Sequence, residues 1–316
     1  MNTALPMRPI SLIGAPADVG AGVRGASLGP EALRVAGLVQ ALRRQGLRVE
    51  DRGDLVGPVN PMHPAHAGCR HLQQVHVWTR LVADAVQASL AWGQVPVLLG
   101  GDHSLAMGSI AAVARHCAGQ GKRLQVVWLD AHADCNTPAT SPTGNLHGMP
   151  LACLLGQGPD VLTGPAPVLH PDQVWLMGLR STDPGEELFL QSMHIRTVRL
   201  HGGADDGGQV VDALAHWLAG LDGDTHVHLS LDLDVLDPLL APGVSTPAAG
   251  GLNAAQAMAC MRLLGQDGRV GSVDLVELNP ARDVRHQTAR LAVALLTHLL
   301  APAGQNTQSR AEVISR

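Results

Sequence analysis

The chain has 316 residues, of which 46% are hydrophobic and only 2% are Phe, Trp or Tyr. The hydrophobic share can fill a large core, and the scarcity of aromatic rings argues against a protein that stacks nucleic-acid bases. The 22 Lys and Arg residues are outnumbered by 27 Asp and Glu, and the net charge is −5. No basic surface for phosphate backbones is therefore predicted, and nucleic acid is not an expected partner.

Cysteine usage and the chain start indicate the compartment. The five Cys residues are odd in number and contain no C-x-x-C pair, which favours a reducing environment over a disulfide framework. The first residues lack the apolar segment of a signal peptide, and no apolar run approaches the roughly 20 residues that span a bilayer. We expect a cytoplasmic protein with no membrane partner.

Short apolar runs alternate with longer helical segments along the chain. The expected strands are Pro9–Ile13, Val95–Leu99, Leu124–Leu129, Val174–Met177, His226–Leu231 and Val270–Val276. The expected helices are Pro30–Gln45, Val77–Trp92, Leu105–Ala118, Gly185–Met193, Gln209–Leu218, Ala254–Leu264 and Thr288–Leu300. This alternation is typical of β-α-β units, so it predicts an α/β fold with a mainly parallel sheet covered by helices on both faces.

Polar motifs follow four of the expected strands. They read G-G-D-H-S at 100–104, D-A-H-A-D at 130–134, D-L-D-V-L-D-P at 232–238 and E-L-N-P at 277–280. In open α/β sheets, sites form in the loops past the carboxyl ends of the strands. These motifs are therefore the candidates for a functional site.

In an extended segment, alternate residues point to the same side, so Asp130, His132 and Asp134 are expected to project together. Any one of the acidic residues could instead cap a turn or a helix. Three such strand ends together are hard to explain by caps, because buried carboxylates need cations. Carboxylates with some imidazole suit manganese and, less well, zinc or iron. Two divalent ions would balance four carboxylates, which indicates a hydrolase with a binuclear metal centre.

These stretches resemble the ureohydrolase family, and within it the arginases. The metal motifs stand here as G-G-D-H-S, D-A-H-A-D and S-L-D-L-D-V-L-D-P, and further landmarks at 13–16, 24–25, 29–30 and 53–55 extend the match to nearly the whole chain. The resemblance implies a three-layer α/β/α sandwich around an eight-stranded parallel sheet. It also implies a single domain over residues 1–303, followed by a polar tail at 304–316 whose composition is typical of disorder.

The resemblance also implies two Mn²⁺ ions per subunit. Carried over to this sequence, one ion would bind His103 and Asp134 and the other His132 and Asp234, with Asp130 and Asp232 bridging both. Two loops would select the substrate. They contain Asn136 and Thr143, which would read an α-carboxylate, and Asp183 and Glu186, which would meet an α-ammonium.

The implied activity is hydrolysis of L-arginine to L-ornithine and urea, by attack of a metal-bound hydroxide on the guanidinium carbon. Glu277 would pair with the guanidinium with Thr246 close by, and His147 would shuttle a proton. Asp134 is counted as catalytic as well as a metal ligand. Alternatives are another ureohydrolase, such as an agmatinase or a guanidinobutyrase, or a catalytically silent metal-binding protein. The resemblance further implies a homo-oligomer, a trimer or a hexamer.

Weaker signals surround these motifs. His63, His66, His71 and His76 form a cluster that we interpret as a surface loop entering a helix rather than as a further metal site. Cys135 is expected to face the core. Asp102 and Asp237 are expected to orient ligands or cap turns.

Overall fold

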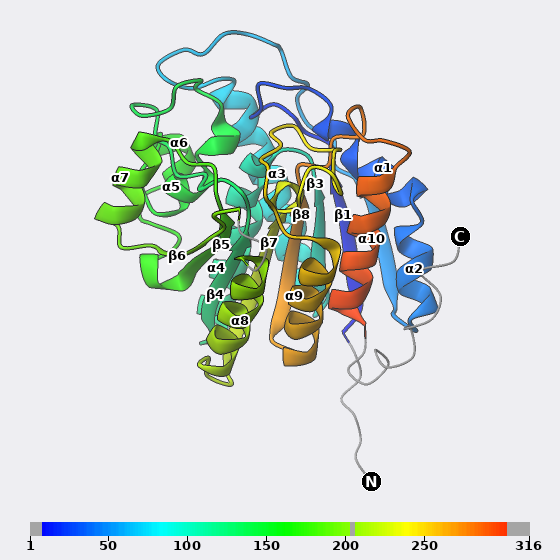
Figure 1. Cartoon of the computed structure of the whole chain (residues 1–316). Helices are drawn as coiled ribbons and strands as arrows, with labels where there is room; N and C mark the ends of the chain where they lie inside the picture. Colours follow the sequence, from blue (N-terminus) through cyan, green and yellow to red (C-terminus); the bar gives the residue numbers. More distant parts are fainter. Residues whose placement is uncertain (1–7, 203–205, 302–316) are drawn as a thin grey trace.

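The structure is a computed structural model that describes residues 8–202 and 206–301. Its centre is a sheet of eight parallel strands in the order β2-β1-β3-β8-β7-β4-β5-β6 (Figure 1). The strands are β1 Ile10–Ala15, β2 Val49–Asp54, β3 Val95–Gly100, β4 Arg123–Leu129, β5 Val174–Leu179, β6 Arg196–Arg199, β7 Thr225–Asp232 and β8 Val270–Val276.

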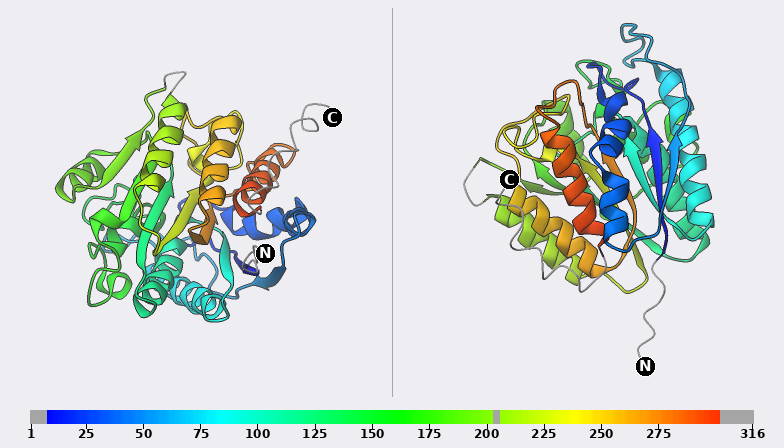
Figure 2. Two further views of the ribbon diagram at one scale, coloured as in Figure 1. Left: turned by 90° about the horizontal axis from the view of Figure 1, so that it is seen from below. Right: turned by 90° about the vertical axis from the view of Figure 1, so that its right-hand side faces the viewer.

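Helices cover both faces of the sheet and complete three layers, as two further views show (Figure 2). One face packs against α1 Gly29–Val35, α2 Leu38–Arg44, α8 Asp206–Ala219, α9 Ala254–Asp267 and α10 Gln287–Leu300. The other packs against α3 Leu72–Ala91, α4 Ala106–Gly119 and α5 Pro150–Leu154, with α6 Asp160–Thr163 and α7 Pro184–Ser192 on the same side. The predicted three-layer α/β/α sandwich with eight parallel strands is confirmed.

All six strands expected from apolar runs are present, with ends shifted by at most two residues. The two strands missing from that set lie at the edges of the sheet. β2 reads V-E-D-R-G-D and is largely exposed, and β6 reads R-T-V-R. Edge strands are open to solvent on one side and tolerate charge, so they lack the apolar signal by which buried strands are found.

The single helix predicted over Pro30–Gln45 is wrong. The segment forms two helices, because Gly37 adopts a left-handed conformation with φ 88° between α1 and α2. Another difference is that α3 starts at Leu72, five residues before the expected Val77. The short helices α5 and α6 were not expected.

The four strands that carry the polar motifs lie side by side at the centre of the sheet, in the order β3-β8-β7-β4. Their carboxyl ends therefore meet at one edge. None of the helices in the described part of the chain combines the length and the apolar character that crossing a membrane requires. The division into a domain over 1–303 and a tail stays a prediction, and the tail at 304–316 lies outside the described residues.

Candidate metal and substrate site

The candidate site is built from the carboxyl ends of the four central strands. His103 opens the 3-10 turn η2 His103–Leu105 after β3, and the D-A-H-A-D segment follows β4. Asp232 is the last residue of β7, Asp234 lies in the turn η5 Leu233–Val235, and Glu277 follows β8. Parallel order thus places residues from four distant parts of the chain together, as expected for this class of sheet.

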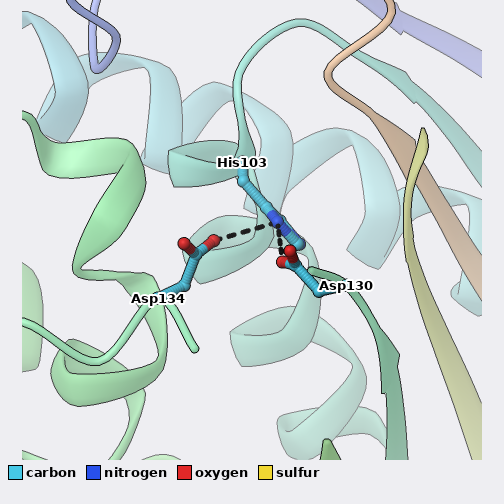
Figure 3. Close-up of side chains that lie close together, drawn as sticks. All are labelled: His103, Asp130 and Asp134. Atoms are coloured by element: carbon cyan, nitrogen blue, oxygen red, sulfur yellow. Dashed lines mark ion pairs between the residues drawn. The ribbon is translucent and has the colours of Figure 1, made fainter. Parts of the chain in front are cut away.

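The first group of candidate ligands surrounds His103, which is 1% exposed. Its Nδ1 lies 3.1 Å from Asp130 Oδ2, 3.0 Å from Asp134 Oδ2 and 3.1 Å from Asp232 Oδ2. Figure 3 shows Asp130 and Asp134 directed at the same ring nitrogen. Since one ring nitrogen carries at most one proton, it can donate to only one of these three carboxylates.

The second group lies around His132. Its Nδ1 is 3.0 Å from Asp234 Oδ2 and 3.7 Å from Asp130 Oδ1. Thr246 donates its hydroxyl to Asp234 Oδ2 over 3.2 Å, so the structure places Thr246 against a candidate ligand. Asp130 belongs to both groups, which is the arrangement that a bridging carboxylate requires.

The D-A-H-A-D residues converge for a different reason than the predicted strand alternation. β4 ends at Leu129, so the motif lies in the loop that follows. The His132 amide donates to Asp130 Oδ1 over 2.7 Å, which folds the chain into a turn. Asp134 adopts φ 51°, a left-handed conformation that is uncommon for a residue with a side chain and is found at functional sites.

The candidate ligands are held by neighbours within the sheet. His103 Nε2 lies 2.8 Å from the Ser230 hydroxyl, and the imidazole stacks on Trp128 with ring centroids 4.5 Å apart. The Trp128 indole also donates to Asp130 Oδ2 over 2.9 Å. These contacts fix the orientation of His103 and leave its Nδ1 facing the carboxylates, a role that outer contacts play in metal sites.

Burial and mutual repulsion change the pKa values of the acidic residues in the site. Burial and the charge of Asp130 raise the pKa of Asp134 to about 6. Burial and the charges of Asp234 and Asp130 raise the pKa of Asp232 well above its usual range. Burial opposes protonation of His103, but the surrounding carboxylates outweigh it and raise its pKa. The site thus concentrates negative charge that protons neutralise in part.

A divalent cation fits this donor set. Two sets of His and Asp ligand atoms each lie within 4.8 Å of one another: His103, Asp130 and Asp134, and Asp130, His132 and Asp234. Carboxylate oxygens with some imidazole nitrogen are donors that manganese prefers. The three oxygens around His103 Nδ1, which one proton cannot satisfy, are the observation that favours a metal ion over simple ion pairing.

Glu277 is 1% exposed and has φ 63°. Its Oε1 accepts from the His103 amide over 3.0 Å and lies 3.0 Å from His147 Nδ1. Its Oε2 is buried and has no hydrogen-bond partner among the residues that the structure describes. Burial opposes the charge on His147, but the hydrogen bond and charge of Glu277 raise the pKa of His147 to about 9.

A cavity of about 150 Å³ opens over this centre. All of the predicted substrate-binding residues line it, as do His147 and the ligands His132, Asp134, Asp232 and Asp234. Glu277 is not among the lining residues, although its neighbour His147 is. Ser141, Pro142, Asn145 and Gly148 also line the cavity and were not predicted. For Asn145 and Gly148, a signal was present in the G-N-L-H-G motif itself.

The two predicted substrate loops are bonded to each other. Asn136 Nδ2 donates to Asp183 Oδ2 over 2.6 Å. Asp183 also caps α7, because its Oδ1 accepts from the Glu186 amide while the Glu186 carboxylate accepts from the Asp183 amide. Burial raises the pKa of Glu186 to about 7. Asp183 therefore acts as a helix cap in the structure. This role is an alternative to its predicted role in substrate binding.

The histidine cluster is separate from this site. His63, His66 and His71 line another cavity, of about 570 Å³, that contains none of the predicted ligands. His71 uses both ring nitrogens on main-chain atoms, because Nδ1 lies 2.7 Å from Val19 O and Nε2 accepts from the His63 amide over 3.0 Å. His76 lines a third cavity, between α3, α4 and the segment after α6. Within residues 8–202 and 206–301, no three of these side chains form a metal-ligating group.

The remaining expectations concern caps. Asp102 accepts from the amides of Gly20 and Ser104, and Asp237 accepts from those of Leu239 and Gly250. Cys135 is fully buried in the core cluster around α3 and α4. All three therefore lie as expected from the sequence.

The fold and the site together define a three-layer α/β/α protein with a carboxylate and imidazole centre able to hold metal ions. The family model described as "Arginase family" matches residues 8–301, and the chain belongs to that family. It is similar to the arginase of Bacillus caldovelox, with 42% identity over 301 residues, 93% of this chain and 98% of that protein. The arginase of Brevibacillus brevis is 40% identical over 293 residues, 91% of this chain and 96% of that protein. The solved structure of the Bacillus caldovelox arginase superposes with a TM-score of 0.85 at 40% identity, covering 94% of this chain and 99% of that one.

Proposed function

We propose that this chain hydrolyses L-arginine to L-ornithine and urea with two Mn²⁺ ions bound per subunit. The observation that carries the proposal is Glu277 Oε2, a buried carboxylate oxygen beside the candidate metal ligands that has no hydrogen-bond partner in the described part of the chain. An orphaned buried acceptor is costly and calls for a donor. A guanidinium is planar and presents several N–H groups to a carboxylate, so it is a donor of suitable shape and charge.

The ions would be held by the residues that converge at the strand ends. His103 and Asp134 would bind one and His132 and Asp234 the other, with Asp130 and Asp232 shared. When bound, two divalent cations supply positive charge to the carboxylates and lower the pKa of a water for attack on the guanidinium carbon.

Glu277 would orient the guanidinium, and His147 would supply the proton that the leaving amine needs. With a pKa raised to about 9, His147 carries its proton at neutral pH, and its side chain lines the cavity. Because His147 Nδ1 lies 3.0 Å from Glu277 Oε1, the imidazole and the guanidinium would share this carboxylate.

Selection of an α-amino acid would come from the two loops that line the cavity. Asn136 and Thr143 would present polar groups to an α-carboxylate, and Asp183 and Glu186 would present acids to an α-ammonium. Agmatine lacks the carboxylate and would leave the first pair unsatisfied. Polar sites built for such groups reject analogues without them.

The test is urea release from the Mn²⁺-loaded protein with arginine, agmatine, guanidinobutyrate and, scored by formamide release, formiminoglutamate. We expect arginine to exceed agmatine in kcat/KM by at least about a hundredfold, roughly 2.7 kcal/mol of transition-state stabilisation. Equal use of both substrates would overturn the substrate assignment. No product release from any of the four would favour a silent metal-binding protein. The homo-oligomer and the cytoplasmic location remain predictions from the sequence.

A further inference from the structure

Arg180 makes an unusual set of contacts next to the site. It follows β5 directly and lies three residues before Asp183. Its guanidinium donates only to main-chain carbonyl oxygens and, among the residues that the structure describes, forms no ion pair. The acceptors are the carbonyls of Gly178, Asp234, Val235, Leu236, Ala248 and Ala249.

The shortest of these bonds reaches a candidate metal ligand. Arg180 Nη2 lies 2.6 Å from the carbonyl oxygen of Asp234. The carbonyls of Val235 and Leu236, at 3.3 and 3.2 Å, complete the end of the η5 turn that carries the Asp234 side chain. Terminal carbonyls of a helical turn lack partners within the turn, so a guanidinium placed there fixes where the turn ends.

The same guanidinium holds a second segment. Nη2 donates to the carbonyl of Ala248 over 2.8 Å and Nε to that of Ala249 over 3.0 Å. This loop contains Thr246, whose hydroxyl donates to Asp234 Oδ2. Arg180 thus ties the Asp234 turn to the loop that also contacts the Asp234 carboxylate.

The backbone of Arg180 reaches a third segment. The amides of Arg180 and Ser181 both donate to the carbonyl of Ala131, at 2.9 Å each, inside the D-A-H-A-D loop. His132 follows directly, and its Nδ1 lies 3.0 Å from Asp234 Oδ2. One residue therefore connects the segments that bring His132, Asp234 and Thr246 together.

We propose that Arg180 is a positioning residue that holds the His132 and Asp234 half of the metal centre in its ligating geometry. This inference rests on the proposed function, because it concerns the ions proposed above. A guanidinium offers five N–H groups in a fixed plane and can span carbonyls on separate segments, whereas a lysine ammonium offers three donors from one atom. The proposal therefore requires the planar guanidinium with its several donors, and not only a positive charge.

Electrostatics and positioning predict opposite effects when the guanidinium is removed. The charges of Asp234 and Asp130 act on Arg180, although burial, the larger influence, lowers its pKa. A cation so close to these carboxylates repels a divalent ion, so loss of its charge alone would raise metal affinity. Loss of positioning would lower metal affinity. The sign of the change decides between the two.

The experiment is a titration of the metal-stripped protein with Mn²⁺. Binding is measured by calorimetry and by the electron spin-resonance signal of free Mn²⁺. Arg180→Met should weaken one of the two sites by about 10- to 100-fold, as loss of residues that orient metal ligands does, while the other site changes less. Arg180→Lys, which keeps the charge but not the planar guanidinium, should weaken the same site as well. The matched control is Arg115→Met on α4, which removes an exposed arginine away from the site and should bind as the parent does.

Circular dichroism and a melting curve of each metal-free variant accompany the titration. Unchanged or tighter Mn²⁺ binding by folded Arg180→Met would overturn the proposal. If that variant does not fold, parent-like binding by Arg180→Lys overturns it instead. A parent protein that binds no Mn²⁺ would refute the proposed function, and the inference would fall with it.

Discussion

Glu277 combines three features that folding alone does not require: burial, a left-handed backbone and a carboxylate oxygen with no hydrogen-bond partner within residues 8–202 and 206–301. Glu277→Gln should therefore reduce arginine turnover by about a hundredfold or more, a loss typical when an active-site charge partner is removed. The amide oxygen of the variant can still accept from the His103 amide, so bound manganese should stay at the parent level.

Urea release and metal analysis of the same preparation check this prediction. Glu187→Gln is the matched control, because Glu187 pairs with Arg199 and does not line the cavity. Near-normal activity of Glu277→Gln would make Glu277 a structural turn residue.

His147 should make the stability of the metal-free protein depend on pH. Its pKa is raised from the ordinary 6.5 to about 9, so the protonated imidazole is stabilised in the folded state by Glu277. The contribution is fully present below pH 6.5 and is lost as the pH rises through 9. His147→Asn lacks this titration, so the difference in unfolding free energy between parent and variant should shrink over that window.

Urea denaturation of both metal-free proteins at about pH 6 and about pH 10 measures this difference. Using the difference cancels other groups, such as Glu186, whose raised pKa also makes stability fall as the pH rises. A gap that stays constant or widens with pH would contradict the His147 and Glu277 ion pair.

At the scale of elements, one variant pair can separate the capping role of the loop before α7 from its proposed role in substrate binding. Asp183→Ala removes the helix cap, which should cost about 1 kcal/mol, and also removes the proposed partner of the α-ammonium. Asp183→Asn keeps a good capping residue but loses the charge. We therefore expect Asp183→Asn to melt as the parent does and yet lose arginine kcat/KM, while turnover of guanidinobutyrate, which has no ammonium group, changes little.

Melting curves and kcat/KM for both substrates, measured on both variants, check this expectation. If Asp183 only caps the helix, Asp183→Asn will match the parent in every measurement. In that case Asp183→Ala will lower both activities in parallel with its melting temperature.

Elements that could be predicted from the sequence are those whose burial leaves a pattern. The central strands β3, β4, β7 and β8 are nearly fully buried and read as apolar runs, and the polar motifs after them are visible at once. The edge strand β2 and the break at Gly37 could not be predicted. Charged residues occur in loops as well as in edge strands, and a single glycine is found within helices as well as between them. The short helices α5 and α6 are too brief to show a periodic pattern.

Site residues follow the same division. His103, Asp130 and Asp232 stand in recognisable motifs at strand ends, so their convergence follows from parallel topology. Ser141 lines the cavity through the path of a loop, which no periodicity encodes. Arg180 acts on carbonyl oxygens, which every residue has, so its partners leave no trace in the sequence.

At the scale of the whole molecule, the fold brings four buried acidic side chains to the ends of the adjacent strands β4 and β7. They belong to Asp130, Asp134, Asp232 and Asp234. Their repulsion opposes folding unless cations are present, and ions that bind only the folded state stabilise it by mass action. Metal removal should therefore lower the melting temperature. Free Mn²⁺ at about 100 times the dissociation constant should restore roughly 2.7 kcal/mol for each independent site.

Stabilisation by bound ions also allows the ligands to be ranked by how much metal binding each variant loses. Asp130 belongs to both candidate ligand groups. Asp232 lies 3.1 Å from His103 Nδ1 and is the second carboxylate that we propose both ions share. We expect Asp130→Ala and Asp232→Ala to lose both ions and most of the manganese-induced rise in melting temperature. His103→Ala should lose mainly one ion and keep part of that rise.

Metal analysis of reconstituted parent protein should approach two manganese per subunit, with melting curves of all four proteins recorded with and without Mn²⁺. A parent that saturates at one ion with full activity would rule out the binuclear centre, and equal losses for His103→Ala and Asp130→Ala would rule out Asp130 as the bridge.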